Sequence, residues 1–271
     1  MSHLLRDHAP ITQDGWKTID DEARERLLPG LAGRRLVDFS GPHGWEYSAT
    51  NLGRVEDDDV SPIKGVEANR RVVLPLVELR ARFTVSREEL RAGDRGAEDV
   101  DFDALDVAAQ SIVEAENLAV FHSWPKGGID GISECSPHDA IHGDGGVEKY
   151  PAHVARAVEL LLRKGIAGPY GLALGREEYM RVVESAEHGG YPLLDHLRKI
   201  LEGPIVWAPG VSGAVVLSMR GGDFSFESGQ DLSVGYESHD SDTVTLYLEE
   251  SFSFRVLTPE AAVAISPLAH S

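Results

Sequence analysis

The sequence holds one cysteine, Cys135, among its 271 residues, and it lacks any long apolar run. A single cysteine excludes a disulfide within the chain and suits a reducing compartment. No stretch approaches the ~18 consecutive apolar residues that a membrane-spanning helix needs. The first residues also lack the apolar core of a secretory signal. These absences predict a cytoplasmic protein without a membrane partner.

Basic side chains are also scarce. Acidic residues outnumber lysine and arginine by 45 to 26, which gives a formal net charge of −19. Contacts with phosphates need a basic face, so binding to nucleic acid or to an anionic membrane is disfavoured. The ordinary interpretation of this charge is solubility and mutual repulsion between molecules. A sharper interpretation is an acidic surface that attracts cations or a basic partner.

The sequence also lacks the common catalytic motifs. It contains no G-x-S-x-G elbow, no Walker loop and no G-x-G-x-x-G after a predicted strand. His138 and His142 could share a metal on a helix, but Pro137 and nearby glycines favour a solvated loop. Residues 239–242 have the composition of a hairpin turn, and Cys135 has no visible catalytic partner. We therefore predict no catalytic residue, no metal ligand, no cofactor and no enzyme activity.

Two helices are clearly predicted. Apolar side chains recur at spacings of three and four over residues 12–28, which indicates a short amphipathic helix with Thr12 or Asp14 as its cap. Its apolar stripe must be covered by the body of the protein, by a neighbouring chain or by a guest peptide. Residues 101–121 predict a longer helix of about 30 Å. A glycine-rich stretch and an α/β pattern follow, over residues 124–219.

Two strands are equally clear. Residues 77–85 alternate apolar and polar side chains, which is typical of a half-buried strand. Residues 243–256 place six apolar side chains on one face, and only Glu250 breaks the alternation. Fourteen extended residues span about 46 Å at about 3.3 Å each, whereas ordinary strands have about 5–6 residues. Such a strand predicts an elongated molecule with neighbours along its flanks.

The loop AEHGGYPL offers a different kind of site. It has too few ligands for a metal and no partner with a readable catalytic role. If several copies met around a symmetry axis, one histidine per copy would form a ring, and adjacent glycines would let the backbones approach. The pattern therefore predicts a pore rim formed by Glu187, His188, Gly189, Gly190 and Tyr191.

A series of segments along the chain resembles the encapsulins, which are bacterial and archaeal nanocompartment shell proteins also called linocin-type bacteriocin proteins. The series covers nearly the whole chain and is specific as an ordered set. It consists of LLRDHAPIT, AGRRLVDFSGPHGWEY, PLVELRARFTV, AENLAVFHSW, GPYGLAL, HGGYPL, RGGDF, GQDLSVGYESHD and EESFSFRVLTPEA.

The resemblance implies an α+β fold of the tailed-phage major capsid class, the Hong Kong 97 type. It assigns residues 1–40 to an N-terminal amphipathic helix and its lead-in, and residues 41–75 to an extended loop. Residues 76–123 and 220–271 form a peripheral domain with a spine helix, and residues 124–219 form an axial domain. The axial loop would line the fivefold pore. Family members usually carry one glycine after its histidine, whereas this chain has two, so the resemblance assigns the pore's location but not its diameter or mobility.

The resemblance also implies a function. The chain would assemble into an icosahedral shell of sixty copies that encloses a cargo enzyme and passes small solutes through pores. The cargo would be a dye-decolorising peroxidase or a ferritin-like iron oxidase, which links the shell to oxidative stress or iron storage. A C-terminal cargo peptide would bind a groove in which aliphatic side chains take up its anchors and Arg34 and Asp38 fix its direction. The implied docking residues are Leu27, Leu28, Arg34, Asp38, Leu232 and Val234.

Three alternatives remain open at this stage. Each docking residue could simply belong to the core. The chain could be a phage capsid protein, whose particles would hold DNA rather than protein, or a protease or bacteriocin-like lytic enzyme with turnover of its own. Some relatives bind flavin beside a tryptophan, but the corresponding stretch FTVSREEL carries none, so no flavin is predicted.

Overall fold

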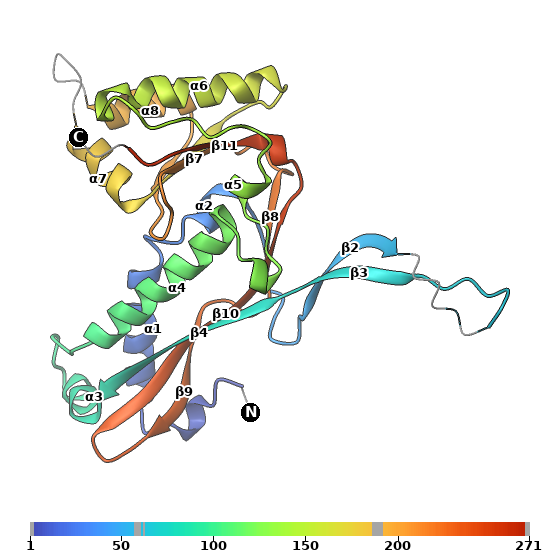
Figure 1. Ribbon diagram of the computed structural model, residues 1–271. Helices are drawn as coiled ribbons and strands as arrows, with labels where there is room; N and C mark the ends of the chain where they lie inside the picture. Colours follow the sequence, from blue (N-terminus) through green and yellow to red (C-terminus); the bar gives the residue numbers. More distant parts are fainter. Residues whose placement is uncertain (1–2, 57–60, 62, 186–191, 269–271) are drawn as a thin grey trace.

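The protein has two blocks of helix and sheet and a projecting hairpin arm (Figure 1). The computed structural model describes residues 3–56, 61, 63–185 and 192–268. The long helix α4 (Asp103–Phe121) runs from one block to the other. This arrangement of helices and sheets confirms the α+β fold class expected from the sequence.

The first block is built on a five-stranded sheet with the order β1-β8-β10-β4, in which β9 also pairs with β10. Helix α4 packs on β4 and β10, and helix α1 packs on α4. Strand β10 lies at the centre because its alternating apolar residues meet the helices. The elements are β1 (Asp38–Ser40), β4 (Val77–Ser86), β8 (Phe224–Ser228), β9 (Ser233–His239), β10 (Thr243–Val256), α1 (Gln13–Leu27), α2 (Gly33–Leu36) and α3 (Arg87–Asp94).

The predicted helices and strands of this block are confirmed. Thr12 caps α1 by accepting a hydrogen bond from the amide of Gly15 at 2.9 Å. The predicted apolar stripe of α1 is buried. Strand β10 extends over the full predicted range, and it runs antiparallel to β4 from Thr243 to Phe252.

The second block contains a four-stranded sheet with the order β11-β7-β5-β6. Every residue of β5 and β7 is buried, because helices α6 and α8 pack against the sheet. The elements are β5 (Tyr170–Leu174), β6 (Ile205–Trp207), β7 (Ala214–Ser218), β11 (Ala262–Ile265), α5 (Ile132–Cys135), α6 (Tyr150–Arg163), α7 (Arg176–Glu184) and α8 (Leu193–Leu201). Short 3-10 turns are η1 (Arg6–His8), η2 (Pro125–Gly127), η3 (Val147–Lys149) and η4 (Pro259–Ala261).

One strand lies on the other side of the predicted domain division. Residues 220–271 were expected to belong to the peripheral domain, yet β11 pairs antiparallel with β7 in the second sheet. The reason is apolar burial, since Ala262, Val263 and Ile265 are almost completely inaccessible to solvent there. The chain therefore crosses back into the second block near its C-terminal end. The domain boundaries themselves remain a prediction.

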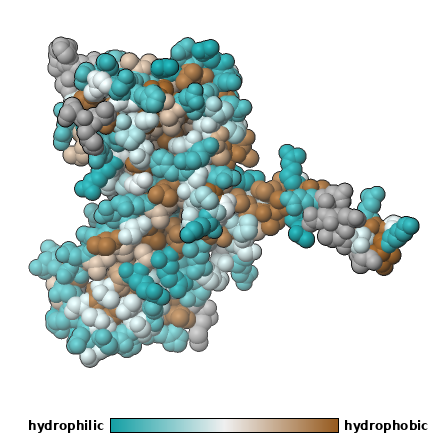
Figure 2. Space-filling model, viewed as in Figure 1, coloured by the Kyte–Doolittle hydropathy of each residue, from teal (hydrophilic) through white to brown (hydrophobic). Residues whose placement is uncertain are grey.

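The arm is a two-stranded antiparallel ribbon formed by β2 (Ala49–Glu56) and β3 (Arg70–Pro75). It projects away from both blocks (Figure 1) and falls within the predicted extended loop, 41–75. Apolar side chains on it are visible in the space-filling view (Figure 2). Those at least half-exposed include Val55, Ile63 and Val66. Exposed apolar residues on a thin ribbon indicate a surface that is covered by another chain.

Candidate functional site

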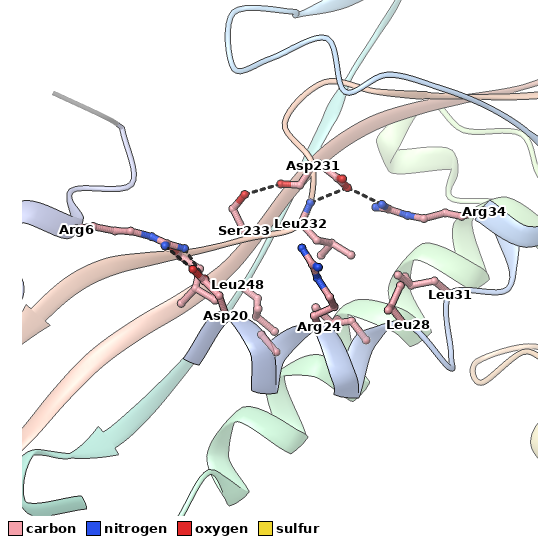
Figure 3. Close-up of a pocket in the computed structure, with 13 residues that line it drawn as sticks. Arg6, Asp20, Arg24, Leu28, Leu31, Arg34, Asp231, Leu232, Ser233 and Leu248 are labelled. Atoms are coloured by element: carbon pink, nitrogen blue, oxygen red, sulfur yellow. Dashed lines mark hydrogen bonds and ion pairs between the residues drawn. The ribbon is translucent and has the colours of Figure 1, made fainter. Parts of the chain in front are cut away.

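The main candidate site is a groove between helix α1 and the segment that leads into β9 (Figure 3). Its volume is about 340 Å³, and strand β10 contributes to its floor. Side chains from four separate parts of the chain converge there. The lining residues are Arg6, Asp20, Ala23, Arg24, Leu27, Leu28, Leu31, Arg34, Asp231, Leu232, Ser233, Val234 and Leu248.

The structure brings together five of the six residues that the resemblance assigned to cargo docking. Leu27, Leu28, Arg34, Leu232 and Val234 all line this groove.

The sixth predicted docking residue, Asp38, lies elsewhere. Its carboxylate accepts a hydrogen bond from the amide of Gly222 at 2.6 Å and lines a separate, smaller cavity. The structure therefore does not bring Asp38 into the groove with Arg34, contrary to the expectation that both residues fix the direction of one bound peptide. The short strand β1, which begins at Asp38, pairs with β8 and holds that carboxylate on the tight turn before β8.

The groove has an aliphatic floor and one prominent aliphatic rim residue. Leu27, Leu31, Val234 and Leu248 are each at most 5% exposed, so their packing is complete without a ligand. Leu28 is 58% exposed although it sits directly at the end of α1. Leu28 therefore adds accessible apolar surface beside the aliphatic floor.

Two of the charged residues in the groove are already paired. Arg6 makes two hydrogen bonds to the carboxylate of Asp20, at 2.7 and 2.8 Å, and a third to the carbonyl of Val234 at 2.8 Å. Arg24 is different, because its guanidinium bonds to no carboxylate among the residues described. It is exposed and lies one turn before Leu28, in the middle of the groove (Figure 3). Arg24 therefore offers the groove's available positive charge.

Arg34 is a structural hub rather than a free ligand group. Its three guanidinium nitrogens donate to Glu116 at 2.7 Å, to Asp231 at 2.6 Å and to Glu250 at 2.5 Å. The guanidinium carbon also lies 5.3 Å from the ring centroid of Phe226, within range of a cation–π contact. Each guanidinium nitrogen of Arg34 thus makes one bond inside the subunit, so this side chain has a structural role whether or not it also contacts a guest. Its role in docking stays a prediction.

This cluster shifts the titration of its members. Burial raises the pKa of Glu116, and the attraction of Arg34 only partly opposes it. Burial also raises the pKa of Glu250 well above its usual range, and the adjacent Glu116 adds to this effect. Burial alone would lower the pKa of Arg34, but the surrounding carboxylates outweigh it and raise the pKa. Removing two carboxylates from water is costly, and Arg34 is the cation that compensates them.

The sequence contained a signal for this cluster that the predictions only half used. Glu250 was identified as the one break in an apolar strand face. Its buried partner Glu116 was missed, although it follows Ile112 by four residues and is completely buried on the core side of α4. An acid on the apolar face of a helix and an acid on the apolar face of a strand both require a buried cation.

The other candidates have ordinary structural roles or lie outside the described residues. The predicted pore residues Glu187 to Tyr191 belong to the undescribed part of the chain. His138 bonds to the carbonyl of Glu260 at 3.1 Å, and residues 3–56, 61, 63–185 and 192–268 contain no group of three potential metal ligands. Asp240 accepts the amides of Asp242 and Thr243, as expected for the predicted hairpin turn.

Among the residues described, no helix is both long enough and apolar enough to cross a membrane.

Solved structures show which class of protein has this fold. A virus-like particle protein from Pyrococcus furiosus aligns with a TM-score of 0.60, covering 92% of this chain and 98% of its own, at 17% identity. The Mycobacterium phage Bobi protein aligns with a TM-score of 0.53 at 13% identity, covering 89% of this chain and 91% of its own. These likenesses define the fold as that of a phage-type capsid protein.

Sequence comparison then identifies the family. Residues 1–253 match the family described as "Encapsulating protein for peroxidase". The type 1 encapsulin shell protein of Rhodospirillum rubrum is 45% identical over all of this chain and 99% of its own length. That of Brevibacterium linens is 42% identical over 98% of this chain and its entire length. The chain belongs to the type 1 encapsulin shell proteins, a family of non-enzymatic subunits that assemble into icosahedral shells.

Proposed function

We propose that sixty copies of this chain form a cytoplasmic shell around a guest enzyme, and that the guest's C-terminal peptide binds the groove beside α1. The observation that carries the proposal is the groove itself, where an aliphatic floor, the exposed Leu28 and the unneutralised Arg24 lie together. The family description favours a peroxidase as guest. A ferritin-like iron oxidase is the alternative that follows from the resemblance.

The groove suits a short peptide with aliphatic anchors and a carboxylate. Burying one aliphatic side chain contributes about 1.5–3 kcal/mol, and two such anchors give only a weak single contact after ordering costs. A multimeric guest facing many identical grooves gains avidity without a stronger individual contact. The guanidinium of Arg24 would pair with an acidic side chain or with the terminal carboxylate of the peptide. Leu28 and Leu232 would hold its apolar side chains.

Replacing Leu28 with Asp should empty the shell without preventing its assembly. The new carboxylate would meet the aliphatic anchor of the guest, while the half-exposed side chain contributes little to the subunit's own core. Native mass spectrometry of shells purified with their guest should give the mass of sixty 29.5 kDa chains plus guest for the wild type. The Leu28→Asp shells should have the mass of the chains alone.

Leu162 provides a matched control, because it is also 58% exposed but lies on α6 in the other block. Leu162→Asp shells should retain their guest. Full loading of Leu28→Asp shells would contradict the groove as the docking site. A shell mass that does not correspond to sixty chains would contradict the proposed copy number.

We also propose that the segment from Glu187 to Tyr191 lines a solute pore, on the sequence argument that its histidine and glycines would form a ring around an axis. His188→Ala should then change the rate at which small charged solutes enter intact shells. The change should be largest over roughly pH 5.5 to 7.5, where an unperturbed histidine titrates. Stopped-flow influx of a quencher against an encapsulated fluorophore measures the rate. Identical rates for variant and wild type across this range would refute a histidine-lined pore.

A further inference from the structure

Two buried carboxyl groups bonded to Arg34 each keep one oxygen without a hydrogen-bond donor among the described residues. Glu116 and Glu250 each bond to Arg34 through Oε2. Their Oε1 atoms are buried, and neither has a donor in the part of the chain described. Both carboxyl groups bond to the same guanidinium, Glu116 at Nε and Glu250 at Nη2, so they lie side by side. Two ionised carboxylates are acceptors only, so this contact is repulsive unless one of them carries a proton.

The charged groups around Glu116 and Glu250 do not cancel the repulsion between the two carboxylates. Among the described residues, Arg34 of α2 is the cation that bonds to Glu116 and Glu250. It also bonds to Asp231, which precedes β9. The next residue along β10, Glu249, points to the opposite face of the sheet, as successive strand residues do. Glu249 pairs with Arg80 of β4 and with His3 of the N-terminal segment. These two basic groups therefore do not compensate the charge of Glu116 or Glu250. One guanidinium thus faces three carboxyl groups, of which two are fully buried.

The remaining surroundings of the pair are apolar. Phe39 and Phe226 stack on each other and lie within 5.4 Å of the Arg34 guanidinium. Leu79 is paired with Glu250 across the sheet. Rings and aliphatic groups cannot solvate a second negative charge.

We propose that Glu116 and Glu250 share one proton between their Oε1 atoms, and that loss of this proton at alkaline pH loosens the floor of the groove. The proton turns a repulsive contact into a hydrogen bond between a carboxylic acid and a carboxylate, which is a short and strong type. Two carboxyl groups that share a site do not both ionise readily. The raised pKa values of both groups agree with this arrangement.

The pair is connected directly to the groove. Arg34 and Asp231 line the groove and are held by the same hydrogen-bond network. Glu250 lies two residues after Leu248, whose side chain is part of the groove floor. When the shared proton leaves, the repulsion between the carboxylates acts on α4, β10 and the segment that precedes β9. The existence of the proton rests on this geometry alone, whereas its effect on a guest rests on the function proposed above.

Infrared difference spectroscopy tests the proton directly. Intact wild-type shells at neutral pH should show the carbonyl stretch of a protonated, buried carboxylic acid. The band should be absent from Glu250→Gln and from Glu116→Gln shells, in which the amide takes over the donor role. Glu249→Gln is the matched control, because it removes an equally buried acid that is ion-paired, and the band should persist. Absence of the band from the wild type, or its survival in both variants of the pair, would overturn the proposal.

The pH dependence provides a second test. A raised folded-state pKa stabilises the folded state at low pH, and this contribution is lost as the pH rises through that pKa. The thermal midpoint of wild-type shells should therefore fall between pH 7 and alkaline pH, and that of Glu250→Gln shells should fall by less than half as much. Equal slopes would contradict the shared proton. Guest release that does not follow the midpoint would contradict only the coupling to the groove, while guest binding at neutral pH tests the groove separately.

Discussion

Replacing Arg34 with Met should lower the free energy of unfolding of the subunit by about 3–5 kcal/mol, the range for removing one partner of a buried ion pair. Methionine fills much of the space of the arginine stem but leaves Glu116 and Glu250 without their cation. The loss should appear as a lower midpoint concentration in guanidinium chloride denaturation and as a smaller yield of assembled shells.

The loss in this variant should depend on pH in a defined direction. Burial already raises the pKa of both glutamates, and removal of Arg34 raises them further. A raised folded-state pKa gives a stabilising contribution that is complete below the unfolded pKa and disappears as the pH rises through the folded value. Arg34→Met should therefore be closest to the wild type in mildly acidic buffer and furthest from it at pH values above neutral.

Arg82 offers a matched control for the arginine substitution. It makes one ion pair, with Glu237 at 2.6 Å, and is 67% exposed at its side chain. Exposed pairs of this kind contribute about 0–1 kcal/mol, so Arg82→Met should leave the guanidinium midpoint almost unchanged. If Arg34→Met were as stable as Arg82→Met, the buried hub would not hold the first block together.

Asn117→Ala should have the second largest effect, a loss of about 3 kcal/mol in the free energy of unfolding. The Asn117 amide group donates to the carbonyls of Gly30 and Pro209, at 2.8 and 3.0 Å. Its oxygen accepts from the amides of Ala32 and Gly33, at 3.1 and 3.3 Å. Alanine would leave the Gly33 amide and the Pro209 carbonyl without this partner, whereas the Ala32 amide and the Gly30 carbonyl still bond to each other at 2.8 Å. Each buried unsatisfied group costs about 1–3 kcal/mol before relaxation.

The same substitution should weaken the connection between the two blocks, since Pro209 belongs to the loop after β6 and Gly30 to the loop after α1. Hydrogen exchange should therefore show faster opening of both loops in Asn117→Ala shells. Gln110 is the control on the same helix, because its side chain is exposed and bonds only to Glu114 among the residues described. Gln110→Ala should change neither the exchange nor the midpoint. Unchanged exchange at both loops in Asn117→Ala would contradict a bridging role.

The sequence predicted those helices and strands whose apolar residues recur at a regular spacing. Helices α1 and α4 and strands β4 and β10 have regular apolar spacing, and each was found close to its predicted bounds. Strand β11 was not predicted, because its four residues carry no signal about which sheet edge they join. That choice depends on the space beside β7, which only tertiary packing defines.

The docking groove was predictable only in part for a similar reason. Periodicity placed Leu27 and Leu248 on apolar faces. The family resemblance identified Leu27 as well, and it alone identified Leu28, Leu232 and Val234. The roles of its charged residues depend on partners far away in the sequence: Arg34 and Glu250 are 216 residues apart. No local pattern reveals that Arg34 bonds to three carboxylates, whereas Arg24 bonds to none among the residues described. Asp38 was misplaced because the turn before β8 takes up its carboxylate.

Strand β10 belongs to both hydrophobic cores. Val244, Leu246 and Leu248 pack in the core under α1 and α4, whereas Phe252 and Phe254 pack in the core of the second block. One unbroken length of backbone therefore carries any pull between the two halves of the subunit, so a tensile load on the wall is shared by ladder hydrogen bonds along its whole length. We therefore expect a rigid subunit, in which case the curvature of an assembled shell would arise at contacts between subunits rather than by bending within them.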